Sequence, residues 1–275
     1  MSLFVASLNS GSNGNCYYIA NQDEAILIDA GISCRETERR MKRLGLSMAN
    51  VRAIFITHEH SDHINGIPSI QKKYNLPIYI TTRTLLKTQL RKTEAYHFEP
   101  YEPISIGKLT VRAFPIPHDA VDPHNFIISN ESVNVGVFTD IGSITDHVIH
   151  NFKQCHAAFL ESNYDEELLE TGRYPLSLKN RIRQGYGHLS NVQAAQLFTT
   201  HRPDFMSHLF LGHLSRNNNS PRIVQNLFEG IAHKTDVAIA SRYKESLLYA
   251  IHPPTGTINP TPYKGIISPV QLKLF

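Results

Sequence analysis

An almost entirely apolar run, VRAIFIT, ends directly in the polar segment HEHSDH. The run is too short for a buried helix, so it predicts a buried strand. His58 and His60 lie two residues apart and point the same way from an extended chain, whereas Asp62 and His63 turn toward a second point. Imidazole and carboxylate donors without a thiolate suit zinc, and also manganese or iron. The segment predicts two neighbouring metal sites at a strand end; the alternative is a polar loop with chance histidines.

Short apolar and β-branched runs recur along the chain and predict strands. The first three are LFVASL, CYYIA and AILIDAG, which polar turns separate. SCRETERRMKRLG has a helical pattern that Ser33 or Thr37 can cap and Gly45 can stop, and residues 65–74 predict a second helix. From Asp146 onward, helical and strand patterns alternate, so the second half mirrors the first. We therefore predict an α/β (α+β) fold with two face-to-face sheets and helices outside, a four-layer αββα sandwich.

Composition narrows the class of protein. The 275 residues are 41% hydrophobic and 19% charged, as in ordinary globular proteins. Cys16, Cys34 and Cys155 are odd in number and form no CxxC pair, which is typical of reduced thiols. We find neither a signal-peptide pattern nor the roughly 20 apolar residues of a membrane helix, so we expect a cytoplasmic protein with no membrane partner. The net charge of +3 permits a phosphate-rich partner without demanding one.

The segment THEHSDH resembles the HxHxDH signature of the metallo-β-lactamase superfamily. The resemblance implies a four-layer αββα hydrolase with two divalent metal ions per chain, zinc or manganese, with iron as a further option. The resemblance also includes four other segments, one before THEHSDH in the sequence and three after it, each at the end of a predicted strand. It implies that Asp29 in LIDAG orients a histidine ligand, and that His118 in FPIPHDA completes one metal site with His58 and His60. The remaining ligands that it implies are Asp140 in VFTDIG, bridging the two ions, and His213 in LFLGHLS, which completes the second site with Asp62 and His63.

Four further segments indicate which branch of the superfamily the sequence resembles. SLNSGSNGN, LESNYDEELLETGRYP, GHLSN and GHLSRNNN are similar to the WalJ/VicX-like branch of the superfamily, which is exonuclease-like. The similarity runs from residue 7 to about 220. The sequence departs from the branch at Tyr164, where relatives often have histidine after ESN. No insertion of β-CASP size is present, which is unlike the large RNA-maturation nucleases.

The resemblance implies a mechanism in which two metals lower the pKa of a shared water, and the resulting hydroxide attacks an ester or phosphodiester. Asp62 and Asp140 are expected to hold and orient this nucleophile, and His188 is a candidate for leaving-group protonation. The candidates for contact with substrate are Ser190, Asn163, Ser215 and Asn217, with Arg216 beside them. Ser190 is equally suited to cap the following helix, and Glu161 could be a solvated turn residue.

Two more segments have alternative interpretations. The turn SGSNGN offers backbone N–H groups and hydroxyls that could form a phosphate-binding nest, although such turns are more often hairpin loops. Basic residues gather on the first predicted helix and could follow a nucleic-acid backbone, although such a run is usually a solvated face. These basic residues are Arg35, Arg39, Arg40, Lys42 and Arg43.

We expect two regions, a catalytic domain at residues 1–250 and a Pro/Gly-rich tail at 251–275. The tail ends in QLKLF, which resembles the QLxLF peptide by which bacterial replication and repair proteins bind the DNA polymerase sliding clamp. A flexible segment of this kind anchors through apolar side chains in a pocket. The alternative is an apolar cap folded back on the domain. The residues predicted to bind the clamp are Gln271, Leu272, Leu274 and Phe275.

Three functions compete. The first is a metal-dependent DNA phosphodiesterase, an exonuclease acting in DNA repair or replication, with DNA as substrate and the sliding clamp as partner. The second is a hydrolase of a small ester, thioester or lactam, because the same metal centre acts on a carbonyl. The third is a clamp-tethered adaptor with structural metals, which a complete ligand set disfavours because structural sites are usually closed by protein ligands. The tail favours the nuclease. Oligomeric state stays open.

Overall fold

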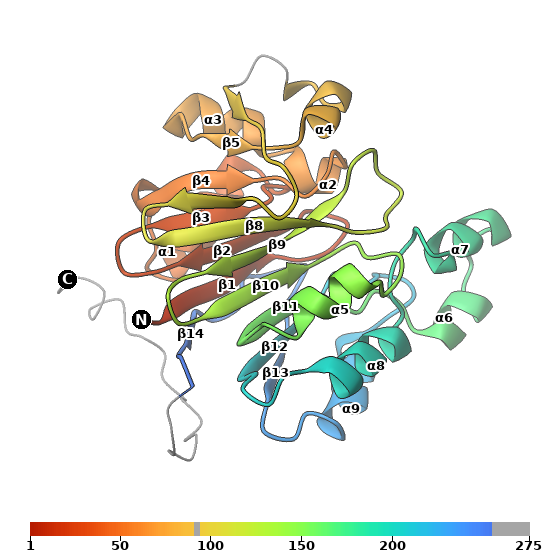
Figure 1. The fold of residues 1–275 in the computed structure, drawn as a ribbon. Coiled ribbons are helices and arrows are strands. Elements are labelled where there is room, and N and C mark those ends of the chain that lie inside the picture. Colours follow the sequence, from red (N-terminus) through yellow and green to blue (C-terminus); the bar gives the residue numbers. More distant parts are fainter. Residues whose placement is uncertain (91–93, 255–275) are drawn as a thin grey trace.

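The first sheet comes mostly from the N-terminal half of the chain in the computed structural model, which describes residues 1–90 and 94–254 (Figure 1). Its spatial order is β14-β1-β2-β3-β4-β5-β6, and β3 to β6 run parallel. The strands are β1 (Leu3–Asn9), β2 (Cys16–Ala20), β3 (Ala25–Ile28), β4 (Val51–Phe55), β5 (Ile78–Tyr79), β6 (Ala95–Tyr96) and β14 (Tyr249–Ile251).

The second sheet lies face to face with the first (Figure 1). Its spatial order is β13-β12-β11-β10-β9-β8-β7, and β10 to β13 run parallel. The strands β7 and β8 form an antiparallel hairpin that turns at Gly107. The strands are β7 (Pro103–Ile106), β8 (Leu109–Pro115), β9 (His124–Ser129), β10 (Asn134–Phe138), β11 (Ala157–Glu161), β12 (His208–Gly212) and β13 (Asp236–Ile239).

Helices cover the outer faces of both sheets (Figure 1). Those on the first sheet's side are α1 (Cys34–Arg43), α2 (Ser61–Ile64), α3 (Ile67–Tyr74) and α4 (Thr82–Lys87), with a 3₁₀ turn at Met48–Asn50. The others are α5 (Asp146–Phe152), α6 (Glu166–Thr171), α7 (Leu176–Arg183), α8 (Asn191–His201) and α9 (Pro221–Glu229). The predicted four-layer αββα sandwich is confirmed.

The alternation of side chains along the strands builds separate cores on the two faces of each sheet. Leu3 and Val5 of β1 enter the core between the sheets, whereas Ala6 and Leu8 enter the core beneath the outer helices. The central core joins both sheets, the second core packs α1 and α3 on the first sheet, and the third packs α5, α8 and α9 on the second sheet. The central strands of both sheets are therefore buried on both faces, as the near-continuous apolar run of β4 predicted.

The first helix begins where the sequence predicted. The Ser33 hydroxyl accepts a hydrogen bond from the N–H of Glu36, and Gly45 turns the chain with φ 73° after the helix ends. Arg40 is not part of a solvated basic face, because it is 6% exposed and donates to the carbonyl of Leu8 and the side chain of Asn9. Arg40 thus joins α1 to β1.

The helix predicted at 65–74 is confirmed as α3, and a separate short helix, α2, precedes it. Gly66 separates α2 from α3, and its N–H donates to the Ala30 carbonyl at 2.7 Å. A Cβ at this position would lie 2.0 Å from the carbonyl oxygen of Ile32. The chain therefore breaks its helix at the one residue that can approach the neighbouring loop this closely.

The described part of the chain ends just after β14, whose residues pair with Leu3–Val5 of β1. The first residue of the predicted tail, Ile251, therefore belongs to the sheet. The predicted clamp-binding residues Gln271, Leu272, Leu274 and Phe275 lie outside the described residues. Within residues 1–90 and 94–254, no helix has the length and apolar character that crossing a bilayer requires.

Candidate metal centre

Histidine and aspartate side chains from both sheets meet at the ends of their strands. His63, which follows β4, has its Nε2 atom 3.0 Å from Oδ2 of Asp140, which follows β10. Nδ1 of His213, after β12, is 3.4 Å from Oδ1 of the same aspartate. In parallel strands the carboxyl ends share one edge of the sheet, where ligand sites commonly form. The remaining predicted ligands belong to the same cluster of side chains. They are His58, His60, Asp62 and His118.

Three residues of the site have an uncommon backbone conformation. Asp29, Asp140 and His213 have φ angles of 61°, 55° and 55°, in the left-handed region. Each comes one or two residues after a strand. Such a conformation costs about 1–3 kcal/mol at a non-glycine residue and gathers at functional sites. The turns direct the three side chains back toward the edge shared by the sheets.

One group of donors consists of His58, His60 and His118. Their nitrogen atoms lie within 4.8 Å of one another, and Nδ1 of His60 is 3.4 Å from Nε2 of His118. Nε2 of His58 is buried and has no hydrogen-bond partner among the described residues. Buried polar atoms are almost always paired, so the orphaned nitrogen fits a missing cation.

The second group consists of Asp62, His63 and His213. Oδ2 of Asp62 is 3.6 Å from Nε2 of His63 and 3.8 Å from Nε2 of His213. The latter nitrogen is also buried without a hydrogen-bond partner in the described part of the chain. Asp140 lies between the groups, with one oxygen 3.0 Å from His63 and the other 3.9 Å from His118. The arrangement fits two cations that share one carboxylate.

Hydrogen bonds behind the imidazoles direct their other nitrogens into the centre. Nδ1 of His63 is 2.7 Å from Oδ2 of Asp29, and Nδ1 of His118 donates to the carbonyl of Gly187 at 3.0 Å. A carbonyl only accepts, so neutral His118 has its lone pair on Nε2. Asp29 also accepts from the backbone and hydroxyl of Thr57. Partners of this kind orient metal-binding histidines.

The charges of the site respond to burial and to one another. Burial lowers the pKa of His58 well below its ordinary value, so this imidazole is neutral. Burial opposes protonation of His213 as well, but Asp140, Asp62 and Glu161 raise its pKa to about 10. In the same way, Asp29, Asp140 and Asp62 raise the pKa of His63 well above the ordinary value. A bound cation would supply the positive charge that these protons supply in the metal-free protein.

Glu161 is a site residue that the sequence analysis did not identify. Its Oε1 atom is 2.8 Å from Nδ1 of both His188 and His213, and its Oε2 accepts from the N–H groups of Ile141 and Leu189. The interpretation as a solvated turn residue is wrong, because the carboxylate is fully buried. The sequence could have identified Glu161 by its position, because it ends the apolar run HAAFLE just as the other ligands follow the ends of apolar strands.

Asn15 is a second such residue. Its side-chain N–H donates to Oδ2 of Asp62 at 3.3 Å and lies 3.0 Å from Nε2 of His63, while its Oδ1 accepts from the N–H of Gly11. Its backbone N–H donates to the carbonyl of Asp62. The turn SGSNGN thus uses several of its N–H groups to support the centre, and Ser12 is its one residue that lines the cavity.

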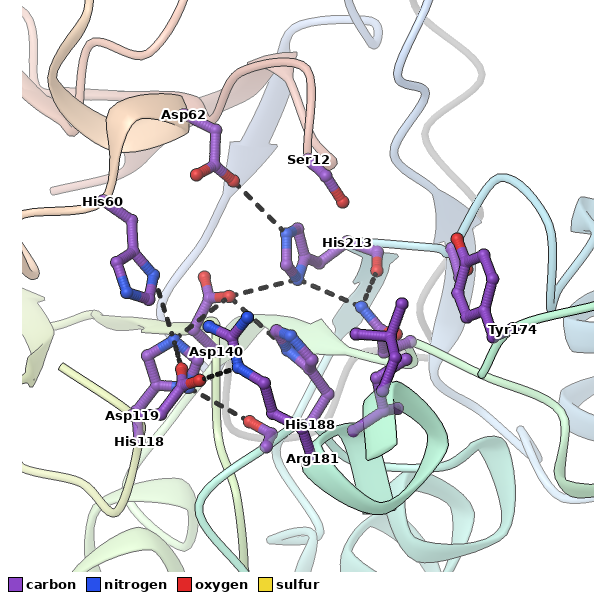
Figure 2. A pocket seen from close by; sticks show the side chains of 15 residues that line it. Ser12, His60, Asp62, His118, Asp119, Asp140, Tyr174, Arg181, His188 and His213 are labelled. Atoms are coloured by element: carbon purple, nitrogen blue, oxygen red, sulfur yellow. Dashed lines mark hydrogen bonds and ion pairs between the residues drawn. The ribbon is translucent and has the colours of Figure 1, made fainter. Parts of the chain in front are cut away.

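A cavity of about 230 Å³ opens over the donors (Figure 2). Apart from the metal ligands, three of the residues that the sequence analysis considered for catalysis or substrate line it, namely His188, Asn163 and Ser215. Ser190 and Asn217 do not. The Ser190 hydroxyl accepts from Gln193 N–H and caps α8, and the Asn217 amide donates to the Tyr174 hydroxyl. The other lining residues are Ser12, His60, Asp62, His118, Asp119, Asp140, Tyr174, Leu178, Arg181, Ile182, Gly187 and His213.

Tyr164, where the sequence departs from the branch that it resembles, does not line the cavity either. It is 5% exposed and forms an isolated bridge with Ser190. Its neighbour Asn163 does reach the cavity, and the Asn163 amide donates to the carbonyl of His213 at 2.8 Å. The residue at which this sequence differs from its branch therefore does not face the cavity.

Comparison with known proteins agrees with this geometry. A beta-lactamase superfamily domain matches residues 24–212, so the chain belongs to the metallo-β-lactamase superfamily, as the sequence predicted. Within it, the chain is 34% identical over 230 residues to exodeoxyribonuclease YycJ of Bacillus anthracis, covering 82% of this chain and 87% of that protein. It is 28% identical over 257 residues to exodeoxyribonuclease WalJ of Streptococcus pneumoniae, covering 91% and 94%. The predicted WalJ/VicX-like branch is confirmed.

Solved structures show the same fold. The metallo-beta-lactamase fold protein YhfI from Bacillus subtilis superposes on this chain with a TM-score of 0.72 at 18% sequence identity. The alignment covers 91% of this chain and 100% of that chain. A diphosphatase from the PhnP family superposes with a TM-score of 0.66 at 15% identity, covering 91% and 98%. At these identities the similarity concerns the fold alone. The family implies divalent metal ions, in keeping with the two donor groups.

Proposed function

We propose that this protein is a metal-dependent DNA phosphodiesterase, an exonuclease, that works with two divalent metal ions, zinc or manganese, with iron as a further option. One observation supports this most directly: two donor groups share Asp140 beneath an open cavity. The chain belongs to the metallo-β-lactamase superfamily, and over most of its length it is similar to two proteins named as exodeoxyribonucleases.

The donors form two groups on either side of Asp140, and each group would hold one ion. His58, His60 and His118 would hold the first ion, and Asp62, His63 and His213 the second. Bound divalent ions activate water as a nucleophile and neutralise charge on a phosphate. Imidazole and carboxylate ligands without thiolate suit zinc and manganese.

The chain's own residues prepare this centre for a phosphodiester. Asp62 and Asp140 present carboxylate oxygens that accept hydrogen bonds from an attacking water and orient it. His188 lines the cavity, and its Nδ1 is fixed by Glu161 at 2.8 Å, so its other nitrogen is directed away from the buried carboxylate. We assign to His188 the transfer of a proton to the leaving oxygen.

The test is hydrolysis of DNA labelled at either end, in the presence of Mn²⁺ or Zn²⁺. The purified protein should release nucleotides from one labelled end, and the double variant Asp62→Asn/His63→Ala should not. Degradation that persists in the variant would reveal a contaminating nuclease. Turnover of small esters, thioesters or lactams without hydrolysis of any DNA or RNA would overturn the nuclease proposal in favour of a small-molecule hydrolase.

We also propose that residues 271–275, QLKLF, bind the DNA polymerase sliding clamp and place the enzyme in the cytoplasm at sites of replication or repair. The support is the peptide alone, which lies outside the described residues. Deletion of 271–275 should abolish binding to an immobilised clamp and leave metal-dependent hydrolysis unchanged. An unfolded deletion variant would mean that these residues are structural instead.

A further inference from the structure

One wall of the cavity comes from a helix that packs into no core. None of the residues of α7 is buried, whereas α8 buries five residues and α9 buries two. Leu178, Arg181 and Ile182 nevertheless line the cavity, and Tyr174 lines it just before the helix (Figure 2). The spacing of the three helical residues places them on one face. We call these four residues the α7 wall.

The α7 wall differs in chemistry from the wall across the cavity. The metal side carries the carboxylates of Asp62, Asp119 and Asp140 together with imidazoles. The α7 wall offers an aromatic ring, two aliphatic side chains and a guanidinium. Among the residues lining the cavity, Arg181 is the one lysine or arginine. An apolar and aromatic surface with one cation, facing a metal centre, matches a nucleotide whose base, sugar and phosphate need different partners.

Arg181 has donors to spare. Its Nε donates to Oδ2 of Asp119, and within residues 1–90 and 94–254 its two Nη groups have no hydrogen-bond partner. The arginine side chain is 62% exposed, and ion pairs so exposed contribute little to stability. A phosphate can accept two parallel hydrogen bonds from a guanidinium. A phosphate entering the cavity would therefore compete successfully with Asp119.

Tyr174 is fixed at the cavity by its hydroxyl. The side-chain amide of Asn217 donates to this oxygen at 3.0 Å, so the loop after β12 contacts the polar end of the ring. A ring held at its polar end leaves its faces for stacking. Stacking of a base on an aromatic ring is favourable and tolerates any base.

The size of the cavity limits what reaches the metals. Its volume of about 230 Å³ is below the roughly 300–1,000 Å³ of ordinary small-molecule pockets. A base that is still paired would bring its partner strand with it, whereas a single nucleotide out of its pair needs less room, as in enzymes that act on a flipped base.

We propose that the α7 wall binds the unpaired terminal nucleotide of a DNA strand, with Tyr174 stacked on the base and Arg181 on a backbone phosphate. This inference rests on the proposed nuclease function and adds its substrate class, strand ends that are unpaired or readily frayed. Tyr174 and Arg181 are then residues that determine specificity. Asp119 holds Arg181 in place until the phosphate arrives.

The first experiment measures binding without hydrolysis. A fluorescently labelled single-stranded oligonucleotide is titrated with protein in EDTA, and anisotropy is followed at several salt concentrations. Arg181→Gln should weaken binding about tenfold and reduce the slope of log K against log salt by about 0.7, the contribution of one phosphate contact. Arg183→Gln is the matched control, because Arg183 lies on the same helix, bonds to Glu170 and Asn180, and does not line the cavity.

The second experiment compares hydrolysis of blunt duplexes with that of duplexes whose terminal pairs are mismatched. The native protein should prefer the mismatched ends, and Tyr174→Ala should remove this preference by raising KM more than it lowers kcat. Tyr174→Phe, which keeps the ring, should retain the preference. Tyr186→Ala is the control at an exposed tyrosine outside the cavity.

The outcomes separate the inference from the function on which it rests. If the native protein degrades DNA and the Arg181 and Tyr174 variants behave as their controls do, the α7 wall has no role in substrate binding and the inference is wrong. If the native protein degrades no DNA, the proposed function fails. Melting temperatures of all variants should equal that of the native protein, because α7 buries no residue and neither Tyr174 nor Tyr186, which lie outside α7, is buried.

Discussion

Single residues at the site contact several partners at once, and Glu161 accepts hydrogen bonds from four. One carboxylate connects the loops that follow β10, β11 and β12 with the segment before α8. Each of its carboxylate oxygens accepts hydrogen bonds from two donors. Replacing either oxygen with the NH₂ group of glutamine would therefore leave two donors without an acceptor.

Glu161→Gln should therefore reduce metal affinity about 10–100-fold, because the amide orients His213 and His188 less well than the carboxylate does. It should also lower the free energy of unfolding by about 1–3 kcal/mol. Competition with a chromophoric chelator measures the first change and urea unfolding the second. Glu167→Gln, on an exposed residue of α6, should change neither. Equal behaviour of the two variants would mean that Glu161 does not position the ligands.

Gly31 is required for a different reason, the close approach of two loops. A Cβ at Gly31 would lie 1.7 Å from the carbonyl oxygen of Asp62 and 2.7 Å from the N atom of Asn15. The Gly31→Ala variant must shift the loop that carries Asp62 and His63, so we expect at least a tenfold loss of metal affinity.

Isothermal titration with Zn²⁺ or Mn²⁺ measures this loss. Gly230→Ala is the matched control, because nothing lies within 4 Å of a Cβ added there and the residue is helical in conformation. Unchanged affinity in the Gly31 variant would show that the loop adapts without moving its ligands.

At the scale of elements, α1 depends on one buried cation. Arg40 donates to the carbonyls of Leu8 and Tyr243 and to the side chain of Asn9, which in turn donates to the carbonyl of Gly14. The helix is thereby joined to the first strand and to the turn that supports the metal centre.

Removing this cation should be costly. Arg40→Ala leaves the buried acceptors without a donor, so we expect it to lower the free energy of unfolding by about 3 kcal/mol. Arg39→Ala, on the same helix with a 61% exposed side chain, should change stability by less than about 0.5 kcal/mol. Chemical denaturation measures both, and similar values for the two variants would contradict the structural role of Arg40.

Elements whose signal is local were predictable from the sequence, and those set by distant contacts were not. The strands around VRAIFIT and LFLG follow from apolar runs, and the Ser33 cap follows from its neighbours. The break at Gly66 and the burial of Arg40 depend on loops far along the chain. Likewise, HxHxDH and the other strand-end ligands could be found by pattern, whereas Asn15 acts through contacts that only the fold creates.

At the scale of the whole molecule, the metal centre joins the two sheets. Asp62 and His63 come from the first sheet, and Asp140 and His213 from the second. A cation bound by both halves is bound by the folded chain and by no local fragment, so its binding free energy adds to global stability.

Metal at about one hundred times its Kd should therefore stabilise the apoprotein by about 2.7 kcal/mol and raise its melting temperature by roughly 5–10 °C. Differential scanning calorimetry of EDTA-treated protein with and without added Zn²⁺ or Mn²⁺ measures the shift. The Asp62→Asn/His63→Ala variant should show little of it. An equal shift in that variant would place the stabilising ion elsewhere.

The lack of buried residues in α7 has a consequence for the evolution of the enzyme. A helix that packs into no core is under little constraint from folding, so its sequence can change while the sandwich and its ligands stay intact. Within one superfamily, this segment is then a place where selection can alter the accepted polymer without rebuilding the catalyst. Exchange of residues 172–186 between relatives is the corresponding route to enzymes with new preferences among DNA ends.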